Sequence, residues 1–259
     1  MMNALNTAAT GMQAQSKQVE VISNNIANAD TVSFKKSRAE FEDLLYQNVQ
    51  APGAATSATT QNPTGVQVGV GVRLAATSRE HGQGSFRPTG RPLDMAIGGG
   101  GFFSIQKPGG DLAYTRDGSF QLDPTGRIVT SQGYPLVPEI VVPPGASDLN
   151  ISPDGRVSVR NGNDVMELGQ IQLTSFPNPA GLMAEGGNLF SPSPSSGTPS
   201  PGNPGDPGIG TVNSNFLEAS NVQPVTEMTD LIRAQRVYEL NSKVVGSADQ
   251  MMATLNQLK

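Results

Sequence analysis

Residues 4–28 read ALNTAATGMQAQSKQVEVISNNIAN, and this stretch does most to decide the fold. One set of its residues recurs at alternating spacings of three and four positions: Leu5, Ala8, Met12, Gln15, Val19, Ile22 and Ile26. Such spacing places the side chains along one stripe of an α-helix and is typical of the seam between paired helices. Gly11 is the one strong helix breaker, with a cost of about 1 kcal/mol relative to alanine. The stretch predicts an N-terminal helix with a mostly apolar seam.

The opposite face of this predicted helix is polar but almost uncharged. Lys17, Glu20 and Asp30 are the only charged residues among the first thirty. The remaining polar positions are Asn, Gln, Ser and Thr, which hydrogen-bond to neighbouring protein without the desolvation cost of an ion. Two interpretations stay open: the helix packs on its own domain, or its outer face is buried among other subunits.

The C-terminal segment mirrors the first. From Pro224 to Leu258 it contains no further proline and one glycine, Gly246. Its seam has the same three-and-four spacing, through Leu231, Ala234, Tyr238, Asn241, Val245, Ala248, Met252 and Leu255. A second stripe occupies an adjacent flank, at Ile232, Val237, Val244 and Met251.

The two predicted helices differ in length. At 1.5 Å per residue they span roughly 37 Å and roughly 52 Å. We expect them to pair as an α-helical coiled-coil domain, so the longer helix keeps an apolar end that another copy of the chain would bury.

Between the helices the pattern changes to β. Residues 66–72 alternate valine with Gln or Gly, which predicts a strand. Apolar runs follow at 93–97, 102–105, 112–115, 119–122, 127–130 and 134–142. Asp123-Pro124-Thr125-Gly126 and Ser152-Pro153-Asp154-Gly155 both place Pro and Gly as a type I turn requires, so they predict two similar hairpins. The segments 51–65 and 191–210 carry no helix or strand signal.

These patterns predict an α+β protein. Residues 1–30 form the first helix, 31–75 an extended or β linker, 76–215 a central all-β domain that is antiparallel and barrel-like, and 216–259 the second helix. The β domain includes the Pro/Gly/Ser loop 191–210.

Composition excludes several classes of function. The 259 residues carry a net charge of −5 and have no basic run, so nucleic-acid binding through phosphate contacts is not expected. The chain has no Cys and one His, which excludes thiolate and multi-His metal sites. No apolar stretch approaches the roughly 18 residues of a membrane span. The N-terminus shows no cleavable signal pattern.

Candidate chemical motifs are weak. The run from Gly98 to Gly101 leads into a strand and lacks a following Gly-Lys-Ser/Thr, so it indicates a tight turn and not a phosphate cradle. The carboxylates in the β region show no spacing that selects an acid–base pair, namely Asp94, Asp111, Asp117 and Asp123. His81 lies in a polar stretch and is expected to be an exposed loop residue. We therefore expect no enzyme activity, no cofactor and no metal.

Three stretches together resemble the bacterial flagellar rod and hook proteins. The first is residues 23–28 with the positions that follow them: Ser23, Asn24, Asn25, Ala27, Asn28, Phe34 and Lys35. The second is Pro92–Ile97 with Gly101–Phe103, Tyr114–Phe120 and Gly133–Leu136. The third is Leu217–Val222, continued by Gln235, Arg236, Asn241, Ser242 and the terminal Leu-Asn-Gln-Leu.

Residues 41–72 resemble the distal-rod members of that family, whereas hook proteins generally lack an insertion here, at about 46–65. Two positions depart from the family pattern. Ser33 replaces a usual Gly, so the turn geometry there is expected to differ, because Ser tolerates a positive φ poorly. Gly98 replaces a usual Asn, which is a mild change because both residues suit left-handed turns.

The resemblance implies a structural subunit of the distal rod, the drive shaft between the motor and the hook; a hook or proximal rod subunit is the alternative. It implies a helical assembly of copies, contacts with proximal rod proteins, hook protein and the surrounding rings, and export through the flagellar apparatus to the periplasm and outer-membrane region without a cleaved signal. We expect helix packing and subunit contact through the seams, at Leu5, Met12, Val19, Ile22, Ile26, Leu231, Tyr238, Val245, Met252 and Leu255. We also expect residues 44–72 to bridge neighbouring subunits and stiffen the rod.

Overall fold

The computed structural model describes residues 2–53, 63–161 and 164–257. The chain divides into two compact units. The helical unit comprises Met1–Ala27, Ser37–Arg79 and Gln223–Lys259. The β unit comprises Asn28–Lys36 and Glu80–Val222.

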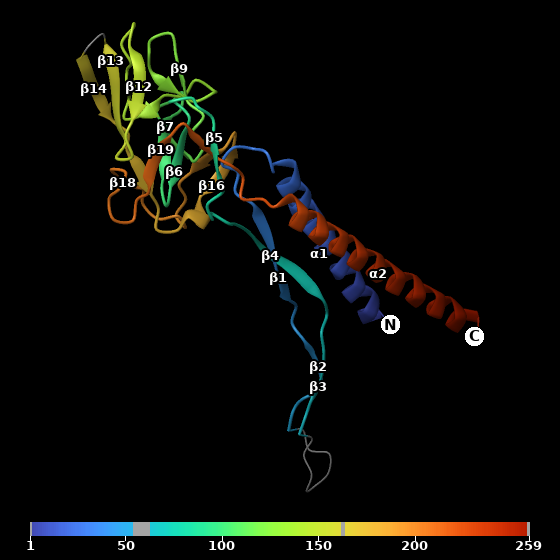
Figure 1. Cartoon of the computed structure of the whole chain (residues 1–259). Helices are drawn as coiled ribbons and strands as arrows, with labels where there is room; N and C mark the ends of the chain where they lie inside the picture. The colour runs from blue at the N-terminus through green and yellow to red at the C-terminus, as the bar shows by residue number, and fades with distance from the viewer. Residues whose placement is uncertain (1, 54–62, 162–163, 258–259) are drawn as a thin grey trace. The chain divides into compact units, whose positions relative to one another are not determined.

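Two long helices dominate the helical unit. Helix α1 spans Met2–Ala27 and helix α2 spans Pro224–Gln257. They lie side by side and antiparallel, so the chain termini fall at the same end of the pair (Figure 1). Both predicted helices are confirmed. Gly11 has a structural reason, because a Cβ there would lie 2.9 Å from the Asn241 side-chain nitrogen, so the small residue lets the two helices approach closely.

A β ribbon belongs to the same unit, and its two longer strands pack against α1 (Figure 1). Strand β1 (Ser37–Asp43) pairs antiparallel with β4 (Val72–Arg79), and β2 (Gln47–Gln50) pairs with β3 (Val66–Val68). The predicted strand 66–72 is therefore interrupted. At Gly71 φ is +126°, and a Cβ there would collide with the hydroxyl of Thr10 on α1. Only glycine lets the backbone turn at this point, where it passes close to the helix.

Antiparallel strands build the β unit. The largest sheet has the order β16 (Met183–Gly186), β17 (Leu189–Ser191), β8 (Leu112–Thr115), β7 (Phe102–Gln106), β15 (Leu173–Ser175) and β18 (Ser200–Gly202), with β11 (Leu136–Val137) also on β7. A three-stranded sheet contains β12 (Ser147–Ile151), β13 (Arg156–Asn161) and β14 (Asp164–Gln170). The pairs are β6 (Met95–Gly98) with β19 (Thr211–Ser214), β9 (Gln121–Leu122) with β10 (Ile128–Val129), and β5 (Phe86–Pro88) with β20 (Phe216–Glu218). A short 3₁₀ helix spans Pro179–Gly181.

The central β region is thus confirmed, but its barrel-like form is not. Within the described ranges the strands form separate sheets, and none of these closes on itself. Alternation along β7 sends Phe103 into the main core and Phe102 into a second aromatic cluster with Tyr114, Phe176 and Phe190.

The two predicted hairpins are confirmed and share further geometry. The amide N of Gly126 donates to the carbonyl of Asp123 at 2.9 Å, and that of Gly155 donates to Ser152 at 2.8 Å. Each turn glycine then accepts a bond from an amide sixteen residues later, from Val142 at 2.7 Å and from Ile171 at 2.8 Å respectively. The two segments are therefore repeats of one structural motif.

The segment 191–210 contains structure that its composition does not signal. Strand β18 lies within it and pairs with β15. Pro201 is tolerated because β18 is the edge strand of the sheet, where a missing amide breaks no ladder bond.

Candidate functional site

The predicted seam of α1 faces into the helical unit. Ile22 is buried, and Leu5, Met12, Val19 and Ile26 are half-buried. The small seam residues Ala8 on α1 and Ala234 and Ala248 on α2 are also buried. Seam burial is therefore deepest at Ile22 and at these three alanines.

Helix α2 buries less of its apolar surface. Leu231 and Val245 are half-buried, but Tyr238 and Met252 are exposed. The side chain of Leu255 lies outside the described residues. Further large apolar residues of α2 are exposed within this chain: Val225, Met228, Ile232, Leu240, Val244 and Met251. One copy of α1 therefore leaves much apolar surface on α2 without cover.

Asn25 links three segments of the helical unit. Its side-chain nitrogen donates to the carbonyl of Ser37 at 2.9 Å and to a carboxylate oxygen of Glu227 at 3.1 Å, and its oxygen accepts the Ser37 amide at 2.9 Å. Asn25 and Glu227 are buried. This signature residue thus ties the ends of both helices to the start of β1.

Asn221 has a similar role in the β unit. Its oxygen accepts the Lys36 amide at 2.8 Å, and its nitrogen donates to the carbonyls of Glu80 at 2.8 Å and Gly82 at 3.2 Å. The segments that leave the β unit toward α1, β4 and α2 are therefore held together on it.

A buried ion cluster lies beside Asn221 in the β unit. The Lys35 ammonium donates to one oxygen of Glu218 at 2.6 Å and to the Gly82 carbonyl at 2.8 Å, while the Arg116 guanidinium donates to the other oxygen of Glu218 at 2.8 Å. The side chains of Lys35 and Glu218 are 0% exposed and that of Arg116 is 4% exposed. Arg116 also donates to the carbonyls of Gly99 and Gly101, so it caps the glycine run.

Burial and charge act together on this cluster. Burial lowers the pKa of Lys35, and the hydrogen bond and charge of Glu218 offset this only in part. Burial alone would raise the pKa of Glu218, but the charges and hydrogen bonds of Arg116 and Lys35 outweigh it and hold that pKa below its ordinary value. Glu218 is therefore ionised at neutral pH.

Ser33 adopts the left-handed conformation, with φ of +55°. Its hydroxyl donates to the Arg116 carbonyl at 2.7 Å, and its amide donates to the Glu218 carbonyl at 2.8 Å. The turn thus has the geometry that a glycine favours, and hydrogen bonds hold the serine in it. Gly98 differs from the expectation: its φ lies outside the left-handed region, and a Cβ there would be 3.2 Å from the side chains of Thr211 and Asn213.

We predict that Ser33→Ala lowers the stability of the β unit by about 1 kcal/mol or more, because it removes the hydroxyl bond and keeps the unfavourable φ. Ser33→Gly loses the same bond but relieves the backbone, so it should be more stable than the alanine variant by about 1 kcal/mol. Hydrogen exchange in residues 95–106 measures both. An alanine variant as stable as the glycine variant would show that φ imposes no cost.

The other signature residues are not gathered into one site. Phe34 and Asn28 are half-buried, and Asn28 accepts two hydrogen bonds from Thr31. Those that are exposed are Ser23, Asn24, Ala27, Gln235, Arg236 and Ser242. Sequence reasoning missed the roles of Glu218 and Arg116. Both lie in the quoted motifs, but no local pattern signals that they meet.

His81 is not an exposed loop residue: it is half-buried, with its ring 5.8 Å from that of Phe102 and 6.0 Å from that of Phe190. In the part of the chain that the structure describes, no group of three or more metal-binding side chains forms, and no helix is long and apolar enough to cross a membrane.

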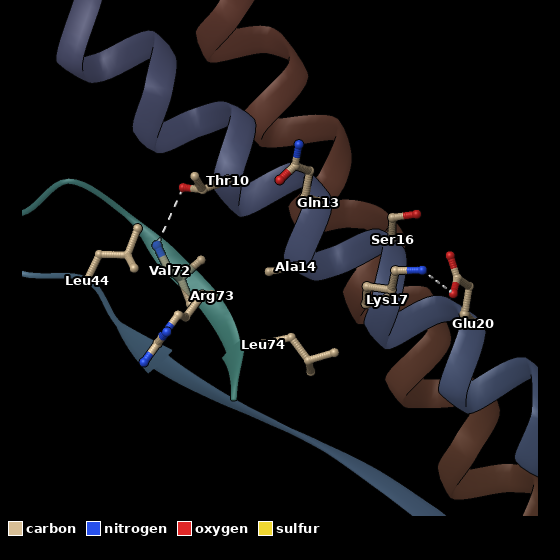
Figure 2. Close-up of a pocket in the computed structure, with 10 residues that line it drawn as sticks. All are labelled: Thr10, Gln13, Ala14, Ser16, Lys17, Glu20, Leu44, Val72, Arg73 and Leu74. Carbon is tan, nitrogen blue, oxygen red and sulfur yellow. Dashed lines mark hydrogen bonds and ion pairs between the residues drawn. The ribbon is translucent and has the colours of Figure 1, made fainter. Parts of the chain in front are cut away.

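An apolar groove completes the candidate site. It lies between α1 and the strand β4, has a volume of about 540 Å³, and contains Ala14 of α1 with Leu44, Val72 and Leu74 on the ribbon side (Figure 2). Exposed apolar helix faces and an open groove are features of a chain that binds other protein chains, not of a catalytic centre.

Three family models match the chain and define its class. Residues 5–35 match the flagella basal body rod protein model, residues 96–159 the D1 domain of the flagellar hook proteins FlgE/F/G, and residues 213–258 the C-terminal model of the flagellar basal body rod FlgEFG proteins. These matches define an axial protein of the bacterial flagellum.

Curated relatives narrow the class. The flagellar basal-body rod protein FlgG of Caulobacter vibrioides is 49% identical over 261 residues, covering 100% of both chains. FlgG of Borreliella burgdorferi is 46% identical over 263 residues, covering 100% of this chain and 99% of the relative, and FlgG of Bacillus subtilis is 40% identical over 265 residues with full coverage of both. The chain belongs to the FlgG family of flagellar basal-body rod proteins. It is a structural subunit of the distal rod of the basal body and not an enzyme.

Proposed function

We propose that this chain assembles with copies of itself into the distal rod and that the rod acts as a drive shaft, carrying torque from the motor to the hook. The observation that carries the proposal is the apolar surface of α2 that its own α1 leaves exposed. Such surface in water favours association with further protein. In this proposal the seams of α1 and α2 pair as a coiled coil, and neighbouring copies cover the remaining faces.

Charge supports stacking through the helical unit. Its three segments contain as many basic as acidic residues, so the whole net charge of −5 belongs to the β unit. Neutral helical units avoid the mutual repulsion that like-charged copies would meet on close packing. A contact between different surfaces of successive copies generates an open helical assembly when the rotation that it repeats does not close into a ring.

The assembly implies a place and partners. We propose that it lies between the periplasm and the outer-membrane region, after export through the flagellar apparatus without a cleaved signal. Its neighbours are the proximal rod proteins, the hook protein and the surrounding basal-body rings; it contacts no nucleic acid and inserts in no membrane. Helices α1 and α2, which lie within the predicted segments 1–30 and 216–259, supply the assembling surfaces, and most of the β unit falls within the predicted segment 76–215.

We also propose that residues 44–72 bridge neighbouring subunits. The β2–β3 ribbon is exposed in the single chain and carries apolar residues at Leu45, Tyr46, Val49, Val66 and Val68. A two-stranded ribbon without cover is at best marginally stable, so it gains from a surface to pack on. Residues 54–62, within the predicted insertion, lie outside the described residues.

Deleting residues 46–65 should give an assembly that bends more easily, because each subunit loses one bridge. The persistence length of the assemblies, measured from their curvature in negative stain, should fall several-fold. An equally stiff assembly would contradict the bridging role.

The terminal helices should be poorly ordered in a dilute monomer, because their apolar faces lack partners there. Amide hydrogen exchange of α1 and α2 should be fast in dilute protein and slow by at least 100-fold in the assembled state, while strand β7 stays protected in both. Slow exchange of both helices in the dilute monomer would contradict assembly-dependent ordering.

A further inference from the structure

The groove between α1 and the ribbon has apolar walls and a neutralised rim. Ala14 is buried at its base, and the nearby charges are already paired (Figure 2). The Lys17 ammonium lies 2.8 Å from a Glu20 oxygen, and Arg73 is paired with Glu42 on the neighbouring strand. A charged occupant would find no unpaired counter-ion among these groups. The groove therefore suits an uncharged apolar ridge.

Helix α2 carries a ridge with these properties at its N-terminal end. Val225 is 80% exposed, Met228 57% and Ile232 49%, at positions i, i+3 and i+7 of one helix face. This is the spacing with which an amphipathic helix inserts anchors into a groove. The exposed neighbours Thr226 and Thr229 are uncharged.

The same chain does not cover its own ridge. Glu227 bonds to Asn25 of α1, and Ala234 is buried on the seam, so the face of α2 that meets α1 lies opposite the ridge. At 1.5 Å per residue the ridge is about 10 Å long, and the α1 wall of the groove, from Thr10 to Glu20, is about 15 Å long. The ridge therefore fits lengthwise.

We propose that the Val225–Met228–Ile232 ridge of one copy docks into the α1–β4 groove of a second copy. The inference rests on the proposed function and specifies one of its subunit contacts. Ridge and groove are different surfaces of the chain. A row of docked copies therefore has a free groove at one end and a free ridge at the other. Such a contact can add subunits repeatedly, as an open helical assembly requires.

Cysteine cross-linking tests this contact directly, because the chain has no native Cys. The variant Ser16→Cys/Met228→Cys places one thiol on the groove and one on the ridge. After assembly and oxidation with copper phenanthroline, we expect a ladder of disulfide-linked multimers on a non-reducing gel. The matched control Ser16→Cys/Ser242→Cys carries its second thiol on another exposed face of α2 and should give at least tenfold less multimer.

The outcomes separate this inference from the proposed function. Rods in the electron microscope without a ladder, or with a ladder of equal yield in the control, overturn the ridge-and-groove contact and leave rod assembly intact. A disulfide within one chain, seen as a monomer of altered mobility, also overturns it, because the occupant would then be the chain's own ridge. Failure of the unmodified protein to assemble at all contradicts both proposals.

Discussion

Glu218→Gln should lower the free energy of unfolding of the β unit by about 3–5 kcal/mol, the cost of breaking a buried ion pair. Glutamine preserves the size of the side chain but removes its charge. Lys35 and Arg116 would then remain buried with no counter-ion between them, and the Lys35 hydrogen bond would lose its ionic partner. Hydrogen exchange of peptides covering residues 95–106, which contain core strands β6 and β7, reports this free energy for the β unit alone.

The matched control for this substitution is Glu167→Gln. Glu167 is exposed on β14, so its replacement should change stability by less than about 0.5 kcal/mol. If the Glu218 variant had the same free energy of unfolding as the Glu167 variant, the cluster would contribute little to holding residues 33–36 and 218–221 on the β unit.

Ile22→Asp should abolish assembly while the β unit stays folded. Ile22 is a seam residue that is only 2% exposed, and the substitution replaces about 2–3 kcal/mol of apolar burial with a carboxylate that has no counter-ion there. A loss above 3 kcal/mol per subunit raises the concentration needed for assembly by roughly 100-fold or more. Val245→Asp should act in the same direction but more weakly, because Val245 is only half-buried.

Ultracentrifugal pelleting measures the loss of assembly in Ile22→Asp and Val245→Asp. Val165→Asp provides the control, since it adds the same charge at an exposed position on β14 of the β unit and should pellet like the unmodified protein. The circular dichroism signal of the β strands should be unchanged in all variants, because the β unit stays folded. Normal pelleting of Ile22→Asp would contradict the assignment of the seam.

The helices could be predicted because their signal is local and periodic. Every third or fourth residue of α1 falls on one face, and no other arrangement buries Leu5, Met12 and Ile22 together. The pattern could not predict how much of the apolar surface of α2 a single α1 helix buries. Tyr238 and Met252 belong to the seam by spacing but remain exposed, because a single α1 covers only a narrow face of the longer helix.

The hairpins were equally predictable, because turn chemistry is local: a Pro at the second position and a Gly at the fourth allow few other backbone shapes. Gly71 and Gly98 were not, because their surroundings come from distant segments, α1 in one case and β19 in the other.

The ion cluster lay beyond sequence reasoning. Lys35, Arg116 and Glu218 are separated by about a hundred residues from one to the next, and charged residues are nearly always exposed. Only the tertiary fold brings the three together and removes water from them.

The most direct test of rod assembly is electron microscopy of the purified protein over a series of concentrations. Rods of constant diameter should appear above a critical concentration and lengthen as more protein is added. Particles of one fixed small size at every concentration would contradict rod assembly.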